Sequence, residues 1–225
     1  MSIVSNYEQR YERINNKLFP TEFVVRWFKG NYPDWRMQQF EPGAKVLDLG
    51  FGDGRNFELF FDLGLKIYGL EISKKITQRV YEQFSEIVQP GCLRVGKNGS
   101  LPFEAGFFDF VVACHAIYYM DRDGNIKLNI SEIARCMKKN GLLLFSIPKD
   151  NSYLISNSER IDDMHVLVSE DPLRLRNGEK LAFASNKEQI LEALSPHFGD
   201  TLVCQNDNDW WGIRESCWIV SCRRL

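Results

Sequence analysis

Short apolar runs alternate with amphipathic segments along most of this chain, which is the pattern of strands followed by helices. The apolar runs are rich in Val, Leu, Ile and Phe and show little alternation with polar residues, so strands buried on both faces of a parallel sheet are expected. Five such runs occupy residues 45–49, 66–70, 92–95, 108–114 and 142–147. The order of these elements predicts an α/β fold, with helices packed on both faces of one sheet.

Helical segments precede the first of these strands. A capping-box pattern at Ser5 and Glu8 predicts a helix that continues to about Lys17. Pro20 precedes a second segment with one apolar face. Residues 1–44 are therefore expected to form a helical segment ahead of the sheet, followed by the main domain at residues 45–225.

The second half of the chain contains β patterns of a different kind. Asn177 and Gly178 separate two alternating segments, which is the strongest short signal for a β-hairpin, and residues 164–168 could add a third strand. We therefore expect a small β insertion at residues 150–184, after the fifth strand. It could shape a substrate pocket or form a dimer contact. Two later runs, 201–204 and 217–222, are expected to pair antiparallel and complete the main sheet.

The segment after the first strand combines glycines with two acids. Asp48 lies near the end of the strand, Gly50, Gly52 and Gly54 follow at alternate positions, and Glu71 ends the next strand. Glycine tolerates positive φ and lets the backbone lie against a ligand. A helix N-terminus after the turn would direct free N–H groups at that ligand, and a carboxylate can accept two hydrogen bonds from a ribose diol. Together they predict a nucleotide-binding βαβ unit.

The glycine spacing excludes the dinucleotide fingerprint G-x-G-x-x-G, because the third glycine would fall on Arg55 or Phe57. The observed spacing is D-x-G-x-G-x-G. VLDLGFGDGRN, with Glu71 downstream, resembles motif I and the second-strand acid of the class I S-adenosylmethionine-dependent methyltransferases. The resemblance implies a Rossmann-like seven-stranded mixed sheet whose last strand is antiparallel. It also implies S-adenosylmethionine as cofactor and N-terminal helices that fold over it.

The resemblance further implies roles for individual residues. Gly50 and Gly52 would let the backbone approach the methionine portion, Asp48 would orient its amino group directly or through water, and Glu71 would hold the ribose. The full set of expected cofactor contacts is Asp48, Gly50, Phe51, Gly52, Gly54, Asn56, Glu71, Ile72, Asn98, Ser100, Leu101 and Cys114.

A second matching segment is GKNGSLPF, which is similar to the family's adenine-side pattern G-D-A-x-x-L-P-F. Lys97 stands where the family usually has an acid that accepts from the adenine amino group, and Lys can only donate. Asn98 or Ser100 could replace that acid, and Asn98 is favoured because its amide both donates and accepts. A plain surface turn at residues 96–100 explains the same sequence equally well.

Candidates for the acceptor side follow the fourth strand. His115 comes directly after Cys114, at the sheet edge where open α/β sheets bind ligands. It is the best candidate for a general base, although a lone histidine can simply pack, and many methyltransferases need no strong base. Tyr119 is a substrate-contact candidate. The absence of N-P-P-[YF] at this strand end argues against the nucleic-acid methyltransferases that act on exocyclic amines.

Two aromatic pairs have two interpretations each. Trp210 and Trp211 lie among acids and an arginine, so they could stack on a polar ring such as a sugar, or they could pack. Tyr7 and Tyr11 lie one helical turn apart and could be lid residues or a packing pair. No metal-ligand cluster is expected.

Bulk properties narrow the choice of function. The 225 residues suit one α/β domain, and the net charge of −2 provides no basic field for nucleic acid or membrane. The six cysteines include no C-x-x-C pair, which suggests reduced thiols. The sequence contains no apolar segment long enough for a signal peptide or a membrane span, so a cytoplasmic protein is expected.

The expected activity is in-line SN2 methyl transfer to an oxygen or nitrogen of a small polar metabolite or saccharide intermediate. The expected partner is a small-molecule substrate, and binding to nucleic acid or membrane is not expected. The protein is expected to be a monomer or a homodimer. The alternatives are a nucleic-acid methyltransferase and a non-catalytic S-adenosylmethionine-binding module.

Overall fold

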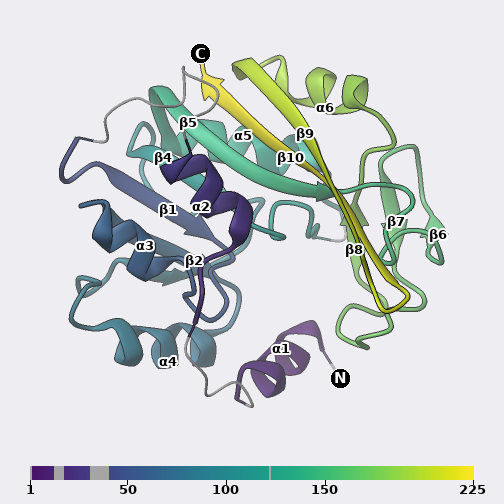
Figure 1. Ribbon diagram of the computed structural model, residues 1–225, viewed down its shortest axis with the longest axis horizontal. Helices are drawn as coiled ribbons and strands as arrows, with labels where there is room; N and C mark the ends of the chain where they lie inside the picture. Colours follow the sequence, from purple (N-terminus) through teal and green to yellow (C-terminus); the bar gives the residue numbers. More distant parts are fainter. Residues whose placement is uncertain (1, 13–17, 31–40, 122) are drawn as a thin grey trace.

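The protein is described from a computed structural model, which covers residues 2–12, 18–30, 41–121 and 123–225. Its main element is a seven-stranded sheet with the order β3-β2-β1-β4-β5-β10-β9 (Figure 1). β3, β2, β1, β4 and β5 run parallel to one another, and β10 is antiparallel to both of its neighbours. The predicted Rossmann-like mixed sheet with an antiparallel last strand is confirmed.

Each strand of the main sheet overlaps one of the expected apolar runs, and β5, β9 and β10 extend several residues beyond theirs. β1 is the centre of the parallel part, because it pairs with β2 on one side and β4 on the other. The bounds are β1 Lys45–Leu49, β2 Lys66–Glu71, β3 Leu93–Val95, β4 Phe108–Ala113, β5 Met137–Pro148, β9 Phe198–Trp210 and β10 Ile213–Arg224.

Two apolar cores, one on each face, hold the sheet between its helices. Alternate residues of β4 divide between them, since Val112 packs in one core and Val111 in the other. The first core includes buried residues of α2 (Glu22–Lys29), α3 (Phe57–Asp62) and α4 (Lys74–Phe84), and the second includes those of α5 (Ile126–Cys136) and α6 (Lys187–Leu194). None of the helices in the described ranges is long and apolar enough to cross a membrane.

The first helix, α1 (Ile3–Glu12), differs from the others because it has no buried residue. The expected cap at Ser5 is wrong: the Ser2 hydroxyl accepts from the Ser5 N–H at 3.3 Å, so the helix begins earlier. The continuation expected at residues 13–17 lies outside the described residues. The boundary between residues 44 and 45 stays a prediction.

The insertion after β5 forms a separate three-stranded sheet, in the order β6 (Glu159–Arg160), β7 (His165–Leu167) and β8 (Lys180–Ala182). The expected two-residue hairpin at Asn177–Gly178 is wrong, because β8 pairs with β7 and not with residues 173–175. A longer loop at residues 168–179 joins the two strands. The backbone N–H groups of Leu173, Leu175 and Arg176 donate to the Asp171 carboxylate, so these three are not available for a strand ladder.

Candidate active site

A cavity of about 1820 Å³ lies at the carboxyl ends of the parallel strands. Its wall includes residues of α1, the strand ends, the insertion and the β9–β10 hairpin. Pockets for single small ligands usually measure about 300–1000 Å³. This cavity therefore has room for a nucleoside-sized ligand and a second molecule beside it.

The glycine turn lies at the base of the cavity, and each of its three glycines is required by a different neighbouring group. All three have positive φ, and only Gly50 lines the cavity. A Cβ on Gly50 would come within 2.6 Å of the Ala116 Cβ, and one on Gly52 would meet the Tyr11 hydroxyl. A Cβ on Gly54 would lie 2.8 Å from the Phe84 ring, so this glycine allows close packing of α4.

Asp48 is the most deeply buried acid of the turn, with 1 % of its surface exposed. Asn56 Nδ2 donates to Asp48 Oδ2 at 3.2 Å, while Asn56 Oδ1 accepts from the Thr21 N–H at 3.0 Å. The pKa of the Asp48 carboxyl is raised to about 7, because the effect of burial is larger than the opposing effect of the hydrogen bond from Asn56. The site thus contains an acid that can change its charge near neutral pH.

Glu71 closes the other side of the turn. Its two carboxylate oxygens accept from the Ile72 N–H at 2.7 Å and the Gly52 N–H at 3.1 Å, which ties the strand end to the glycine turn. Burial raises the pKa of Glu71, and these N–H bonds oppose that shift. Because an ionised carboxylate offers about four lone-pair sites, it can still accept from a ligand diol. Ile72 and Phe51 also line the cavity.

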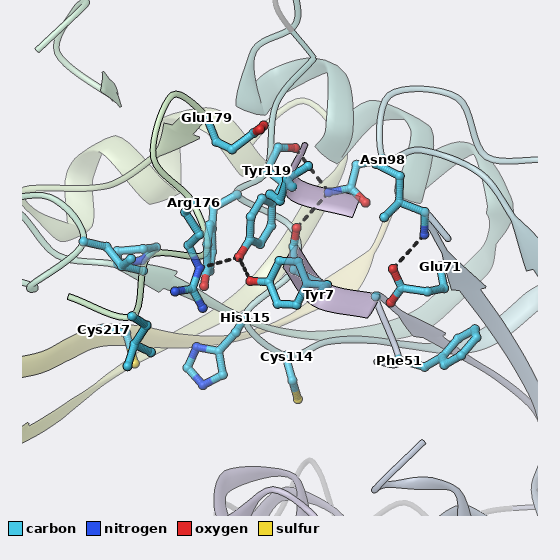
Figure 2. A pocket seen from close by; sticks show the side chains of 18 of the residues that line it. Tyr7, Phe51, Glu71, Asn98, Cys114, His115, Tyr119, Arg176, Glu179 and Cys217 are labelled. Carbon is cyan, nitrogen blue, oxygen red and sulfur yellow. Dashed lines mark hydrogen bonds between the residues drawn. The ribbon is translucent and has the colours of Figure 1, made fainter. Parts of the chain in front are cut away.

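On the expected adenine side, Asn98 has one half of its amide engaged. Its Nδ2 donates to the carbonyls of Ala116 at 2.7 Å and Tyr119 at 3.2 Å, so its Oδ1 is the part that can accept from a ligand (Figure 2). Lys97 pairs with Asp121 at 2.7 Å. Ser100 and Leu101, two further expected contacts, do not line the cavity, because Ser100 belongs to the 97–100 turn and Leu101 packs in the core.

His115 follows β4 in a left-handed conformation, φ 51°. Such strain for a non-glycine residue needs support from its surroundings. Ser146 provides this, since its Oγ accepts from the His115 N–H at 2.8 Å and lies 3.3 Å from His115 Nδ1. His115 Nε2 is 3.6 Å from Glu215 Oε1. Removal from bulk water lowers the pKa of His115, with the Glu215 charge acting against that shift.

Cys114 also lines the cavity, and burial raises the pKa of its thiol well above the usual value. The thiol is therefore a neutral wall group at physiological pH. Trp210 and Trp211 lie at the β9–β10 tip and line the cavity rim, with 50 % and 95 % of their surfaces exposed. Both are available to a ligand, and their stacking role stays a prediction.

The helix α1 reaches both halves of the cavity. Ser73 Oγ donates to Glu8 Oε1 at 2.5 Å on the glycine-turn side, and Asn6 Nδ2 donates to the Leu175 carbonyl at 3.0 Å on the insertion side. Tyr7 Oη lies 2.5 Å from Tyr119 Oη between them. The helix thus contacts both sides of the cavity, and its role as a lid over the cofactor stays a prediction.

Sequence reasoning did not identify Arg176 and Tyr153 as cavity residues, although both line it. Arg176 Nε donates to Tyr119 Oη at 2.7 Å, and its Nη1 lies 3.4 Å from Tyr153 Oη. Each comes from the segment after β5, and no local motif marks either one. In the described ranges no cluster of three or more His, Cys, Asp or Glu side chains could hold a metal ion.

Comparison with known proteins agrees with the geometry. Residues 47–145 match the family model described as "Methyltransferase domain". A curated protein of Haemophilus influenzae, described as uncharacterized, is 30 % identical over 111 residues, which cover 46 % of this chain and 42 % of that protein. The match thus spans less than half the length of this relative.

Solved structures of SAM-dependent methyltransferases share the fold. One from Methanosarcina mazei has a TM-score of 0.60 at 17 % identity, with 92 % of this chain and 99 % of that chain covered. One from Thermotoga maritima has a TM-score of 0.58 at 19 % identity, with 99 % of each chain covered. One from Aquifex aeolicus has a TM-score of 0.52 at 12 % identity, with 97 % and 98 % covered.

Proposed function

We propose that this chain, a member of the class I S-adenosylmethionine-dependent methyltransferases, moves the methyl group of S-adenosylmethionine to an oxygen or nitrogen of a small polar acceptor. One observation carries the proposal. The cavity extends from Gly50 and Glu71 to His115 and the tryptophan rim, and its volume of about 1820 Å³ accommodates a nucleoside and an acceptor together.

The residues of the turn suit the cofactor. Glu71 would accept from the ribose hydroxyls, Gly50 would allow close backbone approach, and the Asp48 carboxylate would hold the ammonium group directly or through water. The Asn98 carbonyl would accept from the adenine amino group, which is the role that Lys97 cannot fill. When bound, the cofactor supplies a methyl group activated by the sulfonium charge.

The protein then contributes alignment and exclusion of water. Holding two reactants in line can provide several kcal/mol of the barrier. Tyr7 and Tyr11 of α1 line the cavity and would keep water out. His115, whose pKa is lowered by partial removal from water, would accept the proton that the acceptor loses, and Glu215 at 3.6 Å would stabilise the resulting imidazolium.

The proposed acceptor is a small polar metabolite or saccharide intermediate, bound beside Tyr119 and beneath Trp210 and Trp211. The net charge of −2 supports a small-molecule partner over nucleic acid or membrane. We also propose that the protein is a monomer or a homodimer and that it is located in the cytoplasm.

The test begins with calorimetry of S-adenosylhomocysteine binding, followed by release of S-adenosylhomocysteine from S-adenosylmethionine across panels of hydroxyl and amine acceptors. We expect saturable binding and turnover with at least one small acceptor. His115→Ala should lower turnover more than nucleoside affinity, and a wild-type kcat would remove His115 as the base. Replacing both tryptophans with Ala should raise the acceptor KM.

Two results would favour the alternatives. Tight nucleoside binding without turnover on any acceptor would point to a non-catalytic binding module. Retention on heparin at physiological salt, together with methylation of RNA or DNA, would point to a nucleic-acid methyltransferase.

A further inference from the structure

The loop between β7 and β8 is organised around one buried acid. The Asp171 side chain is 0 % exposed, and its carboxylate accepts from the backbone N–H groups of Leu173, Leu175 and Arg176 at 2.9, 3.0 and 3.1 Å. Asp171 does not line the cavity. Its negative charge is thus satisfied within the loop and is shielded from a ligand.

This loop presents Arg176 to the cavity. The Arg176 side chain is 12 % exposed, and its Nη1 pairs with Asp171 Oδ2 at 3.1 Å. Nε donates to Tyr119 Oη at 2.7 Å, and the guanidinium lies 5.8 Å from the Tyr7 ring centroid. Figure 2 shows Arg176 on the side of the cavity away from Glu71 and Asn98. The guanidinium is therefore held in place, apart from the groups assigned to the cofactor.

The polar groups around Arg176 have more hydrogen-bond donors than acceptors. Within the described part of the chain, Arg176 Nη2 has no hydrogen-bond partner, although the residue lines the cavity. One of the Tyr7 and Tyr119 hydroxyls donates to the other across 2.5 Å, so the proton of the accepting hydroxyl remains available to a ligand. Tyr153 accepts from Arg176 Nη1 at 3.4 Å and keeps its own proton. A ligand group here must supply several acceptor lone pairs.

We propose that Arg176, with the hydroxyls of Tyr7, Tyr119 and Tyr153, binds a carboxylate of the methyl acceptor. A carboxylate offers about four lone-pair sites and suits the planar guanidinium fork. A phosphate dianion fits less well, because the one arginine is already partly neutralised by Asp171. The inference rests on the proposed methyl transfer, and it narrows the acceptor to small carboxylic acids that carry a hydroxyl or amine.

The test uses differential scanning fluorimetry of the full chain with acetate, glycine, benzoate and inorganic phosphate. Acetamide and benzamide serve as neutral isosteres, and sodium chloride equalises ionic strength. Each series is run with and without saturating S-adenosylhomocysteine. The variants are Arg176→Gln, Arg176→Lys and Arg174→Gln. The last is a matched control, because Arg174 is an exposed arginine of the same loop that does not line the cavity.

We expect at least one carboxylate to raise the Tm of wild type and Arg174→Gln by about 3–6 °C over its amide, the scale for a ligand near ten times its Kd. Arg176→Gln should lose this shift, and Arg176→Lys, which keeps the charge without the fork, should lose most of it. The Kd of S-adenosylhomocysteine, measured by calorimetry, should stay within about twofold in all variants.

Three results of the fluorimetry would overturn the inference. They are equal shifts by amides and carboxylates in wild type, an undiminished carboxylate shift in Arg176→Gln, and a shift by phosphate alone. A loss of S-adenosylhomocysteine affinity confined to the Arg176 variants would instead place Arg176 in the cofactor subsite and also overturn it. If wild type failed to bind S-adenosylhomocysteine at all, the proposed function would fail, while the ligand-free series would still report on the anion site. If Arg176→Gln failed to fold, Arg176→Lys would decide the outcome.

Discussion

Asp48 and Glu71 are both acids at strand ends, and their surroundings give them different properties. Asp48 receives a side-chain hydrogen bond from Asn56, and burial dominates its pKa. Glu71 receives backbone N–H bonds from Gly52 and Ile72, which favour its charged form against burial. One acid is thus suited to titrate, and the other to remain an acceptor for a ribose diol.

Replacing Glu71 with Ala should weaken S-adenosylhomocysteine binding by about 1–3 kcal/mol, the scale for losing hydrogen bonds to a charged group. The turn would also lose the acceptor for the Gly52 N–H. Calorimetry measures the effect, and Glu58→Ala, an exposed acid of α3, is the control. Glu71→Gln should fall between wild type and Glu71→Ala, and an unchanged affinity in Glu71→Ala would refute the ribose role.

The raised pKa of Asp48 leads us to predict how the free energy of unfolding depends on pH. Its folded pKa of about 7 lies above the ordinary value of 3.8, so between these two values the folded state holds a proton that the unfolded state has released. Stability from this group is therefore present at low pH and falls as pH rises toward 7, by at most about 1.4 kcal/mol per pH unit.

Urea unfolding of the ligand-free protein at pH 5, 6 and 7 tests this prediction. Asp48→Asn, which cannot titrate, should show a flatter decline of the free energy of unfolding with pH than wild type. Identical pH slopes for the two proteins would show that Asp48 does not titrate in this range.

At the scale of elements, the strands were predictable and several helix ends and the hairpin were not. Apolar runs identify buried strands because both faces of a parallel strand need apolar side chains. Helix ends depend on one side chain finding one N–H group. Ser185 and Asn186 are both residue types that cap helices, and Asn186 caps α6, since Asn186 Oδ1 accepts from the Gln189 N–H at 3.0 Å. Lys138 and Lys139 directly follow α5 and belong to β5, where Lys138 pairs with Asp109 at 2.8 Å.

The 168–179 loop shows why the hairpin was missed and how the structure can be tested. Asp171→Ala removes the acceptor of three backbone N–H groups, so amide exchange in this loop should speed up by at least several-fold. The affinity for S-adenosylhomocysteine should stay near wild type, because the loop lies on the insertion side. Hydrogen-exchange mass spectrometry measures the first effect and calorimetry the second.

A matched control is Glu170→Ala, an exposed acid next to Asp171 in the same loop. It should leave exchange in residues 168–179 unchanged. Equal exchange in Asp171→Ala and wild type would mean that the carboxylate does not hold the loop.

At the scale of the whole molecule, the residues around the glycine turn could be predicted to lie together, and those on the insertion side of the cavity could not. Asp48, Gly50 and Glu71 lie within one βαβ unit, so their meeting follows from local chain geometry. Arg176 and Glu215 reach the same cavity from the insertion and from β10. Their placement depends on tertiary packing that no local pattern encodes.

The helix α1 is the element that spans both halves. It has no buried residue. Polar contacts join Glu8 to Ser73, Asn6 to Leu175, Tyr7 to Tyr119 and Glu12 to Lys75, and half-buried Tyr7 and Tyr11 pack against the edge of one core. Such an element should open at low free-energy cost. Since Tyr7 and Tyr11 line the cavity, a bound nucleoside would add contacts that only the closed position allows.

We therefore expect saturating S-adenosylhomocysteine to slow amide exchange in α1 by at least several-fold, because a ligand that binds only the closed state shifts the population toward it. Hydrogen-exchange mass spectrometry with peptides covering residues 3–12 measures this, and peptides covering α6, which does not line the cavity, serve as the control. Glu8→Ala removes the acceptor for the Ser73 hydroxyl, so it should raise exchange of α1 in the free protein and weaken nucleoside binding. If exchange of α1 were the same with and without nucleoside, α1 would be a packing element and not a lid, and the closed cavity would have to be explained by the insertion and the β9–β10 hairpin alone.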